Sequence, residues 1–396
     1  MIDIHHYGKR LEQALAHIEK APIPKANKES LLAFYRACVA DGIKAGKLHR
    51  YLGDLLFLTR NNKKKYIDYT RKDIEEIVVR IEQSAYAEWT KYSYKIGLRK
   101  FFTWLKGKDG EFPPEVKWIK LRQKACNAKM PEDLVTEEEV KKMILAVNNL
   151  RDRALIASLY ESGCCISEIL TMCMKHVIFD MHGVVINVFG KTGSRRVRLV
   201  SSTLYLQEWI NRHPLHDNPE AYVWCKEFEP ADIVGYDRIR DMLKEVARRA
   251  GVKKKVNPHN FRHSRANLMA NHLTESQLKE VFGWTQASRM ASVYVHLSGK
   301  NTDTAVLRMY GKVIEEEVKG GVLLPMDCMR CKTQNEATNK FCRLCGLPLD
   351  EQTQHDLITN EYRQKEAGKI MDLLLKDKEV MALLQKKMLE KVQQPT

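Results

Sequence analysis

Four cysteines toward the C-terminal end of the chain have the spacing of a metal site. Cys328 and Cys331 form one C-x-x-C pair, Cys342 and Cys345 form a second, and ten residues separate the two pairs. Each pair lets two thiolates reach one ion from a tight turn, so the two pairs together complete a tetrahedral four-sulfur site. A redox dithiol needs only one such pair, and four unrelated buried thiols need no spacing at all. The sequence therefore predicts a structural Zn²⁺ site.

A second group of residues brings together an imidazole, a guanidinium, an indole, a phenol and an amine. His259 and Arg262 lie three residues apart in NPHNFRHSRANL, so they share one face of a predicted helix. Trp284 precedes Tyr294 by ten residues, and Lys191 lies in GKTGS, which is typical of a tight turn between two strands. Each of these residues taken alone is more often structural, as a core side chain or a solvated lysine. Only their combination along the chain favours a chemical role.

The pattern of apolar residues divides the chain into the segments that must position these groups. Residues 1–107 are predicted to be helical, and residues 108–130, rich in Gly, Pro and Lys, are predicted to be a basic linker. Residues 131–318 are predicted to be helical except for a three-stranded antiparallel meander formed by VIFD, VVINVF and RRVRLV. Residues 326–350 resemble a zinc ribbon, and residues 351–396 are predicted to be a charged amphipathic helix. The predicted fold class is mainly α with a small antiparallel β-meander.

The composition limits the kinds of partner. The chain has 396 residues, enough for two or three domains, and its formal net charge of +16 favours nucleic acid over a generically basic surface. No apolar run is long enough to cross a membrane, and MIDIHHYGKR lacks the apolar core of a signal peptide. We therefore expect a cytoplasmic protein whose ten cysteines do not form structural disulfides.

Basic residues alternate with tyrosines in the N-terminal helical segment. On helices this pattern places cations and aromatic rings on a shared exposed face that suits phosphates. For any single residue, a solvated charged face is an equally good interpretation. The candidate DNA-binding residues are Lys63, Lys64, Lys65, Lys91, Lys95, Arg99 and Lys100.

Taken together, these segments resemble the tyrosine recombinase (phage integrase) family. The family's H-x-x-R box matches His259 to Arg262, its histidine or tryptophan after a glycine matches Trp284, its Y-x-H motif begins at Tyr294, and its hairpin lysine matches Lys191. The resemblance extends over nearly the whole chain to about residue 312. The pattern GW…RM…VYVHLSG, followed by the zinc ribbon, is most similar to integrases of archaeal mobile elements and viruses.

The resemblance implies a helical, SAM-like core-binding domain and a catalytic domain that close as a clamp around duplex DNA. It implies a dimer or tetramer on DNA, associated with the nucleoid, and it suggests that the C-terminal helix docks on a neighbouring protomer, although packing on its own domain is an equally good interpretation. Tyr310, in VLRMYG, is a competing nucleophile candidate, but it lacks the Y-x-H flank of Tyr294 and the expected distance after Trp284.

The family's chemistry gives each matched residue a role. Tyr294 would attack a DNA phosphodiester to form a 3′-phosphotyrosine and a free 5′-hydroxyl, so that rejoining needs neither ATP nor a catalytic metal. Arg262 would stabilise the charge on the non-bridging oxygens, because a guanidinium binds phosphate in a bidentate manner. His259 would assist proton transfer at the tyrosine, Trp284 would donate its indole N–H, and Lys191 would protonate the leaving oxygen.

One position departs from the family. Its first box, G-x-R-x-S-E, matches residues 163–168 except that Cys165 occupies the place of an arginine. A thiol cannot replace a permanent cation, and losing one charge-stabilising donor typically costs ~10²–10³-fold in rate. We expect Cys164 to be a small apolar residue and Glu168 to lack its charge partner. Three explanations stay open: a change that traps a DNA complex, a degenerate integrase that cuts slowly, or a basic residue that reaches in from elsewhere.

Two other functions stay open. A catalytically silent DNA-binding regulatory protein derived from an integrase would use the same clamp and ribbon, and Cys165 favours that hypothesis. The retained Tyr294, His259, Arg262 and Lys191 oppose it. A type IB-like topoisomerase, which shares the chemistry, is the weaker alternative.

Overall fold

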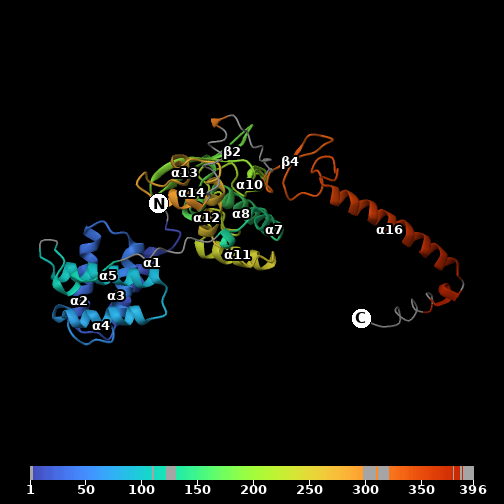
Figure 1. Cartoon of the computed structure of the whole chain (residues 1–396). Helices are drawn as coiled ribbons and strands as arrows, with labels where there is room; N and C mark the ends of the chain where they lie inside the picture. The colour runs from blue at the N-terminus through green and yellow to red at the C-terminus, as the bar shows by residue number, and fades with distance from the viewer. Residues whose placement is uncertain are drawn as a thin grey trace.

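The chain folds into two bodies with separate hydrophobic cores, followed by a small cysteine-containing unit and a long helix (Figure 1). The computed structural model describes residues 3–108, 111–121, 131–297, 309–310, 321–377, 379–383 and 386. The predicted fold class is confirmed, because helices dominate and a three-stranded antiparallel sheet is present in the larger body.

The N-terminal body is a bundle of amphipathic helices whose apolar faces meet around aromatic side chains. Phe34 and Phe101 pack edge to face in its centre, with ring centroids 5.2 Å apart. Its elements are α1 (Tyr7–Lys20), α2 (Lys25–Ala40), α3 (Ala45–Thr59), η1 (Tyr66–Asp68), α4 (Arg71–Gln83), α5 (Glu88–Lys106) and α6 (Pro114–Lys117).

The segment predicted as a linker is partly built into this body. Val116 and Ile119 are buried in the same core as α2 and α5, because Pro114 starts the short helix α6 and turns two apolar side chains inward. The prediction of a linker from residue 108 is therefore corrected as far as residue 121, and residues 122–130 lie outside the described part of the chain.

The larger body is built around α8 (Leu150–Ser162), most of whose residues are buried. The predicted meander is confirmed as β1 (Val177–Asp180), β2 (Gly183–Gly190) and β3 (Gly193–Leu199), in the order β1-β2-β3. The remaining elements are η2 (Pro131–Asp133), α7 (Glu137–Leu145), α9 (Ile166–Leu170), η3 (Met174–His176), α10 (Thr203–Asn211), α11 (Tyr236–Arg249), α12 (Pro258–Met269), α13 (Glu275–Phe282) and α14 (Met290–Leu297).

The last part of the described chain contains the cysteine unit and the predicted tail helix. The cysteine unit contains a short hairpin of β4 (Met326–Asp327) and β5 (Gln334–Asn335). The hydroxyl of Tyr205 on α10 forms a hydrogen bond of 2.9 Å with the hydroxyl of Thr338 in this unit. The helix α16 (Glu351–Lys376) extends away from both bodies and exposes apolar side chains such as Ile358 and Leu373 (Figure 1). In the described part of the chain, no helix is both long and apolar enough to cross a membrane.

Candidate active site

The H-x-x-R box opens α12, and the packing of that helix fixes its arginine. Asn257 caps the helix by accepting a hydrogen bond from the backbone of Asn260 at 2.9 Å. The Arg262 side chain is buried, and its guanidinium donates to the carbonyl oxygens of Gly163 at 2.9 Å and Phe282 at 2.5 Å. Because these carbonyls end α8 and α13, the guanidinium is held where three helices meet.

Tyr294 lies beside this arginine on α14. Its ring stacks in parallel on that of Trp284, with centroids 5.7 Å apart, and Trp284 stacks on Phe282 at 4.9 Å. The Arg262 guanidinium lies 5.5 Å from the Trp284 ring. Burial raises the pKa of Tyr294 to about 12, although the charge of Arg262 acts in the opposite direction. The phenol is therefore neutral near pH 7 and needs a proton acceptor before it can attack.

The residue in contact with the Tyr294 hydroxyl is His263, which the sequence analysis did not single out. Nδ1 of His263 is within hydrogen-bonding contact of that hydroxyl. The predicted His259 lies behind it, with the two imidazole centroids 4.3 Å apart. His263 follows His259 by four residues on α12, so the helical spacing that grouped His259 with Arg262 was also the signal for His263.

The hairpin turn brings Lys191 to the same region. Lys191 and Thr192 form the exposed turn between the paired residues Gly190 and Gly193. The Thr192 hydroxyl donates to the carbonyl of Gly283 at 2.8 Å and so ties the turn to the loop that carries Trp284. The structure therefore gathers His259, Arg262, Trp284 and Tyr294 around one region, and Thr192 ties the hairpin turn that carries Lys191 to the same loop.

Cys165 is exposed and stands at the start of α9, where its backbone N–H donates to Glu168 at 2.7 Å. Its neighbour Cys164 is buried as expected, and desolvation raises the pKa of Cys164 to about 11. The expectation that Glu168 lacks a charge partner is wrong. Arg195 of β3 binds Glu168 through two hydrogen bonds of 2.7 and 2.8 Å. Burial raises the pKa of Glu168, but these bonds and the charge of Arg195 outweigh it, so that pKa is lowered overall.

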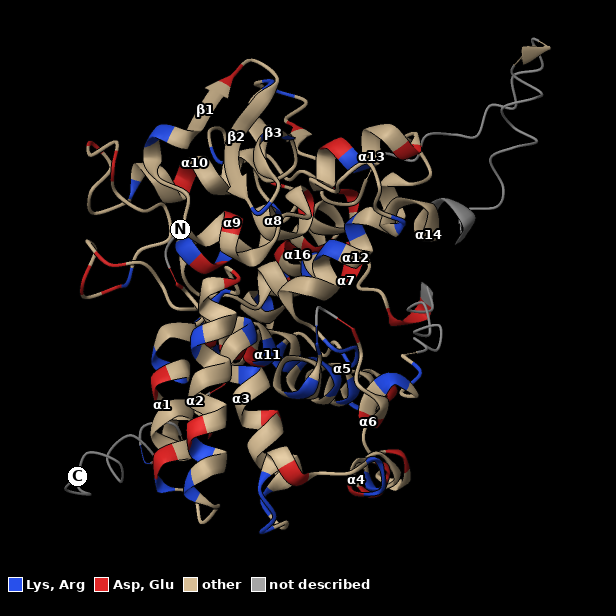
Figure 2. Ribbon diagram, turned by 90° about the vertical axis from the view of Figure 1, so that its left-hand side faces the viewer, with Lys and Arg blue, Asp and Glu red and all other residues tan. Residues whose placement is uncertain are grey.

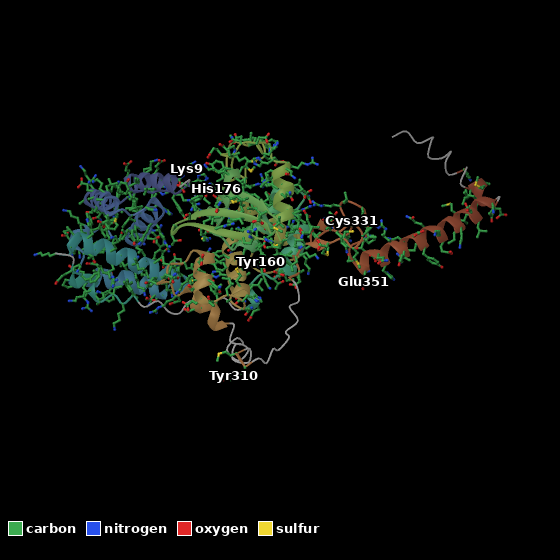
Figure 3. The ribbon with its side chains drawn as sticks, turned by 90° about the horizontal axis from the view of Figure 1, so that it is seen from above. Lys9, Tyr160, His176, Tyr310, Cys331 and Glu351 are labelled. Atoms are coloured by element: carbon green, nitrogen blue, oxygen red, sulfur yellow. The ribbon has the colours of Figure 1, made fainter. Side chains whose placement is uncertain are left out.

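The competing nucleophile candidate lies elsewhere. Tyr310 is 75% exposed and stands apart from the larger body (Figure 3). The residues on either side of it, 298–308 and 311–320, lie outside the described part of the chain, as does the side chain of His296.

The seven candidate DNA-binding residues do not behave as a single free patch. Lys63 and Lys65 are exposed in the turn after α3. Arg99 lies over the ring of Phe112 at 4.7 Å. The other four make ion pairs within the N-terminal body: Lys64 with Asp73, Lys91 with Glu88, Lys95 with Glu82 and Lys100 with Asp41. The side chains of Lys64 and Lys100 are more exposed than those of Lys91 and Lys95. Exposed pairs contribute little to stability, so a phosphate can compete for Lys64 and Lys100.

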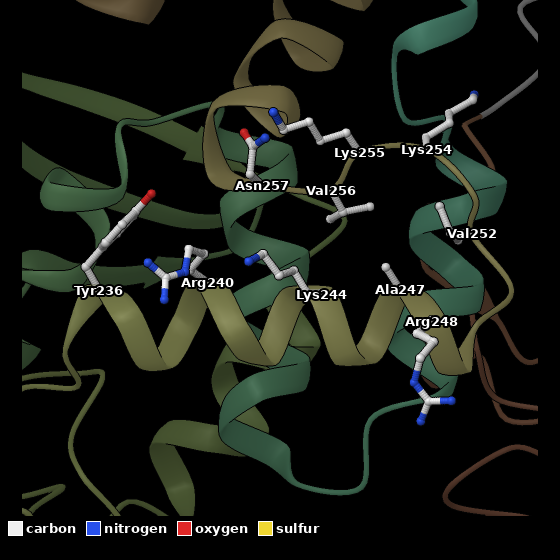
Figure 4. A pocket seen from close by; sticks show the side chains of 10 residues that line it. All are labelled: Tyr236, Arg240, Lys244, Ala247, Arg248, Val252, Lys254, Lys255, Val256 and Asn257. Carbon is white, nitrogen blue, oxygen red and sulfur yellow. The ribbon is translucent and has the colours of Figure 1, made fainter.

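A basic pocket that the sequence analysis did not identify lies between α11 and the loop that leads to α12 (Figure 4). Its volume is about 560 Å³, and its cationic lining residues are Arg240, Lys244, Arg248, Lys254 and Lys255. The helix α11 lies on the side of the larger body that faces the N-terminal helices, and α5 lies across from it (Figures 1 and 2). Cations are therefore present on both sides of the boundary between the two bodies.

The four predicted metal ligands converge. The sulfur atoms of Cys328, Cys331, Cys342 and Cys345 all lie within 4.8 Å of one another, and two of the pairs are 3.5 Å apart. Sulfurs bound to one Zn²⁺ at ~2.3 Å in tetrahedral geometry lie ~3.8 Å apart, so this donor set fits a single ion of that type. The cluster can hold a metal ion, as the sequence predicts.

Comparisons with known proteins agree with this architecture. Residues 133–301 match the phage integrase family. A tyrosine recombinase of Thermosipho africanus is 28% identical over 253 residues, which cover 60% of this chain and 84% of the relative. The tyrosine recombinase XerA of Pyrococcus horikoshii is 25% identical over 255 residues, covering 63% and 84%.

Solved structures share the fold. The integrase of the transposon Tn1549, in complex with a circular intermediate DNA, aligns with a TM-score of 0.55 at 14% identity and covers 72% of this chain and 99% of that one. A lambda integrase tetramer bound to a Holliday junction aligns with a TM-score of 0.53 at 13% identity, covering 67% and 76%. The fold is thus that of the tyrosine recombinases and integrases. Residues 133–301 form a phage integrase family domain, and the chain is a homologue of the tyrosine recombinases.

Proposed function

We propose that this protein is a site-specific DNA recombinase that cuts and rejoins duplex DNA through a 3′-phosphotyrosine on Tyr294. The observation that carries the proposal is the contact of the Tyr294 hydroxyl with His263, beside the buried guanidinium of Arg262. A phenol, a neighbouring imidazole that can accept its proton and a fixed cation are the groups that attack on a phosphate requires, and the raised pKa of Tyr294 makes the proton acceptor necessary.

Each residue has a task in the cleavage step. His263 accepts the phenol proton as Tyr294 attacks the phosphorus, and His259, in ring contact with His263, donates a hydrogen bond to the phosphate. Arg262 stabilises the negative charge that builds on the non-bridging oxygens, which is worth ~10²–10³-fold in rate for one preorganised donor. Lys191, at the exposed tip of the hairpin, protonates the 5′-oxygen as it leaves. No bond energy is lost, so the free 5′-hydroxyl of another strand can reverse the step.

Duplex DNA is the proposed partner, held between the two bodies. The cations that line the α11 pocket and those of α5 lie on opposite sides of that boundary and bind phosphates irrespective of base sequence. Several of the pocket cations form ion pairs with carboxylates on the same surface, as Arg248 does with Glu245. Because these pairs are exposed and weak, the phosphates of DNA can displace the carboxylates. Affinity should fall steeply with salt, because bound counterions are released from the DNA. Dimers or tetramers on DNA are proposed by analogy with the lambda integrase assemblies.

Zn²⁺ is the proposed metal of the cysteine unit, where it has a structural role. Four protein thiolates fill a tetrahedral shell, which leaves no position for substrate. Bound there, the ion fixes the two C-x-x-C turns and so holds Thr338 against Tyr205 of α10. Cleavage at Tyr294 is carried by side chains of the larger body.

The experiment that tests the function is covalent trapping. A duplex selected from a random-sequence pool for binding is nicked so that the fragment with the 5′-hydroxyl diffuses away after cleavage. The wild-type protein is expected to form a denaturation-resistant protein–DNA adduct, and Tyr294→Phe to form none while binding the duplex equally well. Equal adduct from both proteins would exclude Tyr294 as the nucleophile.

A catalytically silent DNA-binding protein is the second candidate, and the exposed Cys165 in the place of an arginine is the observation that favours it. This hypothesis predicts tight duplex binding with no adduct from the wild-type protein. The trapping experiment separates the two candidates directly.

A further inference from the structure

The place left without charge by Cys165 is reached by an arginine from another element. Arg195 lies on β3, where the register pairs it with Val188 of β2, and its guanidinium extends across to Glu168 on α9. Nη2 of Arg195 also donates a hydrogen bond of 3.4 Å to the sulfur of Cys164, the residue that precedes Cys165. The Nε–H donates to the carbonyl of Val281 at 2.9 Å, near the end of α13. Arg195 therefore connects the sheet, the first box of the family and the helix that precedes Trp284.

We propose that Arg195 supplies, from the sheet, the positive charge on the scissile phosphate that position 165 lacks. This inference rests on the proposed recombinase function. In the family's first box, the position of Glu168 is paired with the arginine of the same box. Here Glu168 also has an arginine partner, but that partner is Arg195 of β3. The net charge of the pair is unchanged, and only the element that delivers the guanidinium differs.

Two glycines leave room for this arrangement. A Cβ on Gly283 would stand 2.8 Å from Nη1 of Arg195, and a Cβ on Gly190 would stand 2.2 Å from the Glu168 carboxylate and 3.6 Å from the same Nη1. Because the distances of 2.8 and 2.2 Å are shorter than a normal contact, a residue larger than glycine at position 283 or 190 would displace the ion pair of Arg195 and Glu168. Of the five N–H donors of the guanidinium, four have partners in the described structure, and the fifth, on Nη1, is on this glycine-lined side.

The charges that act on Cys165 suit a position where a phosphate binds. Desolvation by surrounding protein atoms raises the pKa of its thiol, and the Glu168 carboxylate acts in the same direction, whereas the cations of Arg262, Arg195 and Lys191 act to lower it. Three cations, each from a different element, and one carboxylate therefore act electrostatically on this small side chain. The thiol of Cys165 is smaller than an arginine side chain, so it occupies less of the space beside these cations.

The strand offers a matched control. Arg196 follows Arg195, but alternation along β3 turns it to the exposed face of the sheet. Arg195→Gln and Arg196→Gln therefore remove the same charge from neighbouring positions of one strand, and only the first removes it from the site.

The test compares single-turnover adduct formation on the nicked duplex. Arg195→Gln is expected to slow the wild-type rate ~10²-fold or more, and Arg196→Gln to change it less than threefold. The double variant Cys165→Arg with Arg195→Gln is expected to recover most of the loss, because it returns a guanidinium to the same place. On a duplex whose scissile group is an uncharged methylphosphonate, the loss caused by Arg195→Gln should shrink at least tenfold.

A merely structural Arg195 gives a different result. Removing the partner of the buried Glu168 lowers thermal stability in either case, so stability does not separate the two roles. A purely structural role would not be rescued by Cys165→Arg and would show the same loss on the neutral substrate, and either result overturns the inference. If the wild type forms no adduct but Cys165→Arg does, Arg195 supplies no useful charge although Tyr294 is the nucleophile. If neither forms an adduct while both bind the duplex, the proposed function fails as well.

Discussion

Nδ1 of His263 contacts the hydroxyl of Tyr294, across 31 residues of sequence. The contact joins α12 to α14 and is reinforced by the stack of Tyr294 on Trp284. Because the pKa of this phenol is raised to about 12, a proton acceptor in contact with it decides whether it can attack at neutral pH.

Removing His263 should slow cleavage far more than binding. For His263→Ala we expect adduct formation to fall ~10²–10⁴-fold, the usual contribution of a positioned proton acceptor, with duplex affinity unchanged. His272, exposed in the turn after α12, provides the control, and His272→Ala should match the wild type. Single-turnover rates and binding isotherms decide the matter, and a loss of less than threefold for His263→Ala would assign proton transfer elsewhere.

The pH dependence of the His263→Ala variant should report the phenol itself. Without the imidazole only the phenolate attacks, so the rate should rise tenfold per pH unit from pH 7 to 10 without levelling, since the raised pKa lies near 12. An ordinary tyrosine would begin to level near its usual value of ~10. A substrate with a 5′-bridging sulfur, whose leaving group needs no proton, removes the contribution of Lys191. Levelling at or below pH 10 would contradict the raised pKa.

The nucleophile should be Tyr294 and not Tyr310. Tyr310→Phe is expected to keep wild-type adduct formation, because Tyr310 is 75% exposed and stands apart from the larger body (Figure 3). Peptide mapping of the trapped adduct should find the nucleotide on the peptide that contains Tyr294. Adduct recovered on the Tyr310 peptide would reverse the assignment.

The cysteine unit should bind one Zn²⁺ per chain. Cys342→Ser is expected to lose the metal and to release the contact of Thr338 with Tyr205, because three thiolates do not complete the shell. Elemental analysis measures the metal, and hydrogen exchange at residues 326–350 measures order. Cys173→Ser, outside the cluster, should keep the ion. Adduct formation by Cys342→Ser should stay within tenfold of the wild type, since the site at Tyr294 contains no ligand of the metal.

Docking of the cysteine unit should weaken as pH rises. Burial, then the nearby Glu208, raises the pKa of Glu336 from 4.5 to about 7, although Arg153 opposes the shift. A carboxyl whose folded pKa is raised contributes its full stability below about pH 4.5, and that contribution is lost as pH rises toward 7. Glu336→Gln should therefore flatten the fall in thermal stability between pH 5 and 7. The exposed Glu132→Gln should leave the fall unchanged. An identical pH profile for wild type and Glu336→Gln would refute the linkage.

The sequence by itself determined the features that depend on local spacing. Two C-x-x-C pairs determine that four thiolates can meet, β-branched runs separated by short turns specify the meander, and three-residue spacing places His259 and Arg262 on one helical face. These features follow from the geometry of turns, strands and helices over a few residues, so they can be predicted before any packing is known.

The tertiary structure decided which side chains meet across the chain. Val116 and Ile119 joined the N-terminal core because a buried apolar pair outweighs a polar, proline-rich context. The contact of His263 with Tyr294 required α14 to pack on α12, and the pairing of Arg195 with Glu168 required β3 to lie beside α9. No local pattern distinguishes Arg195 from Arg196 as the partner of Glu168, since both are strand arginines. Only the face that the sheet turns toward α9, where burial of a carboxylate demands a charged partner, settled that choice.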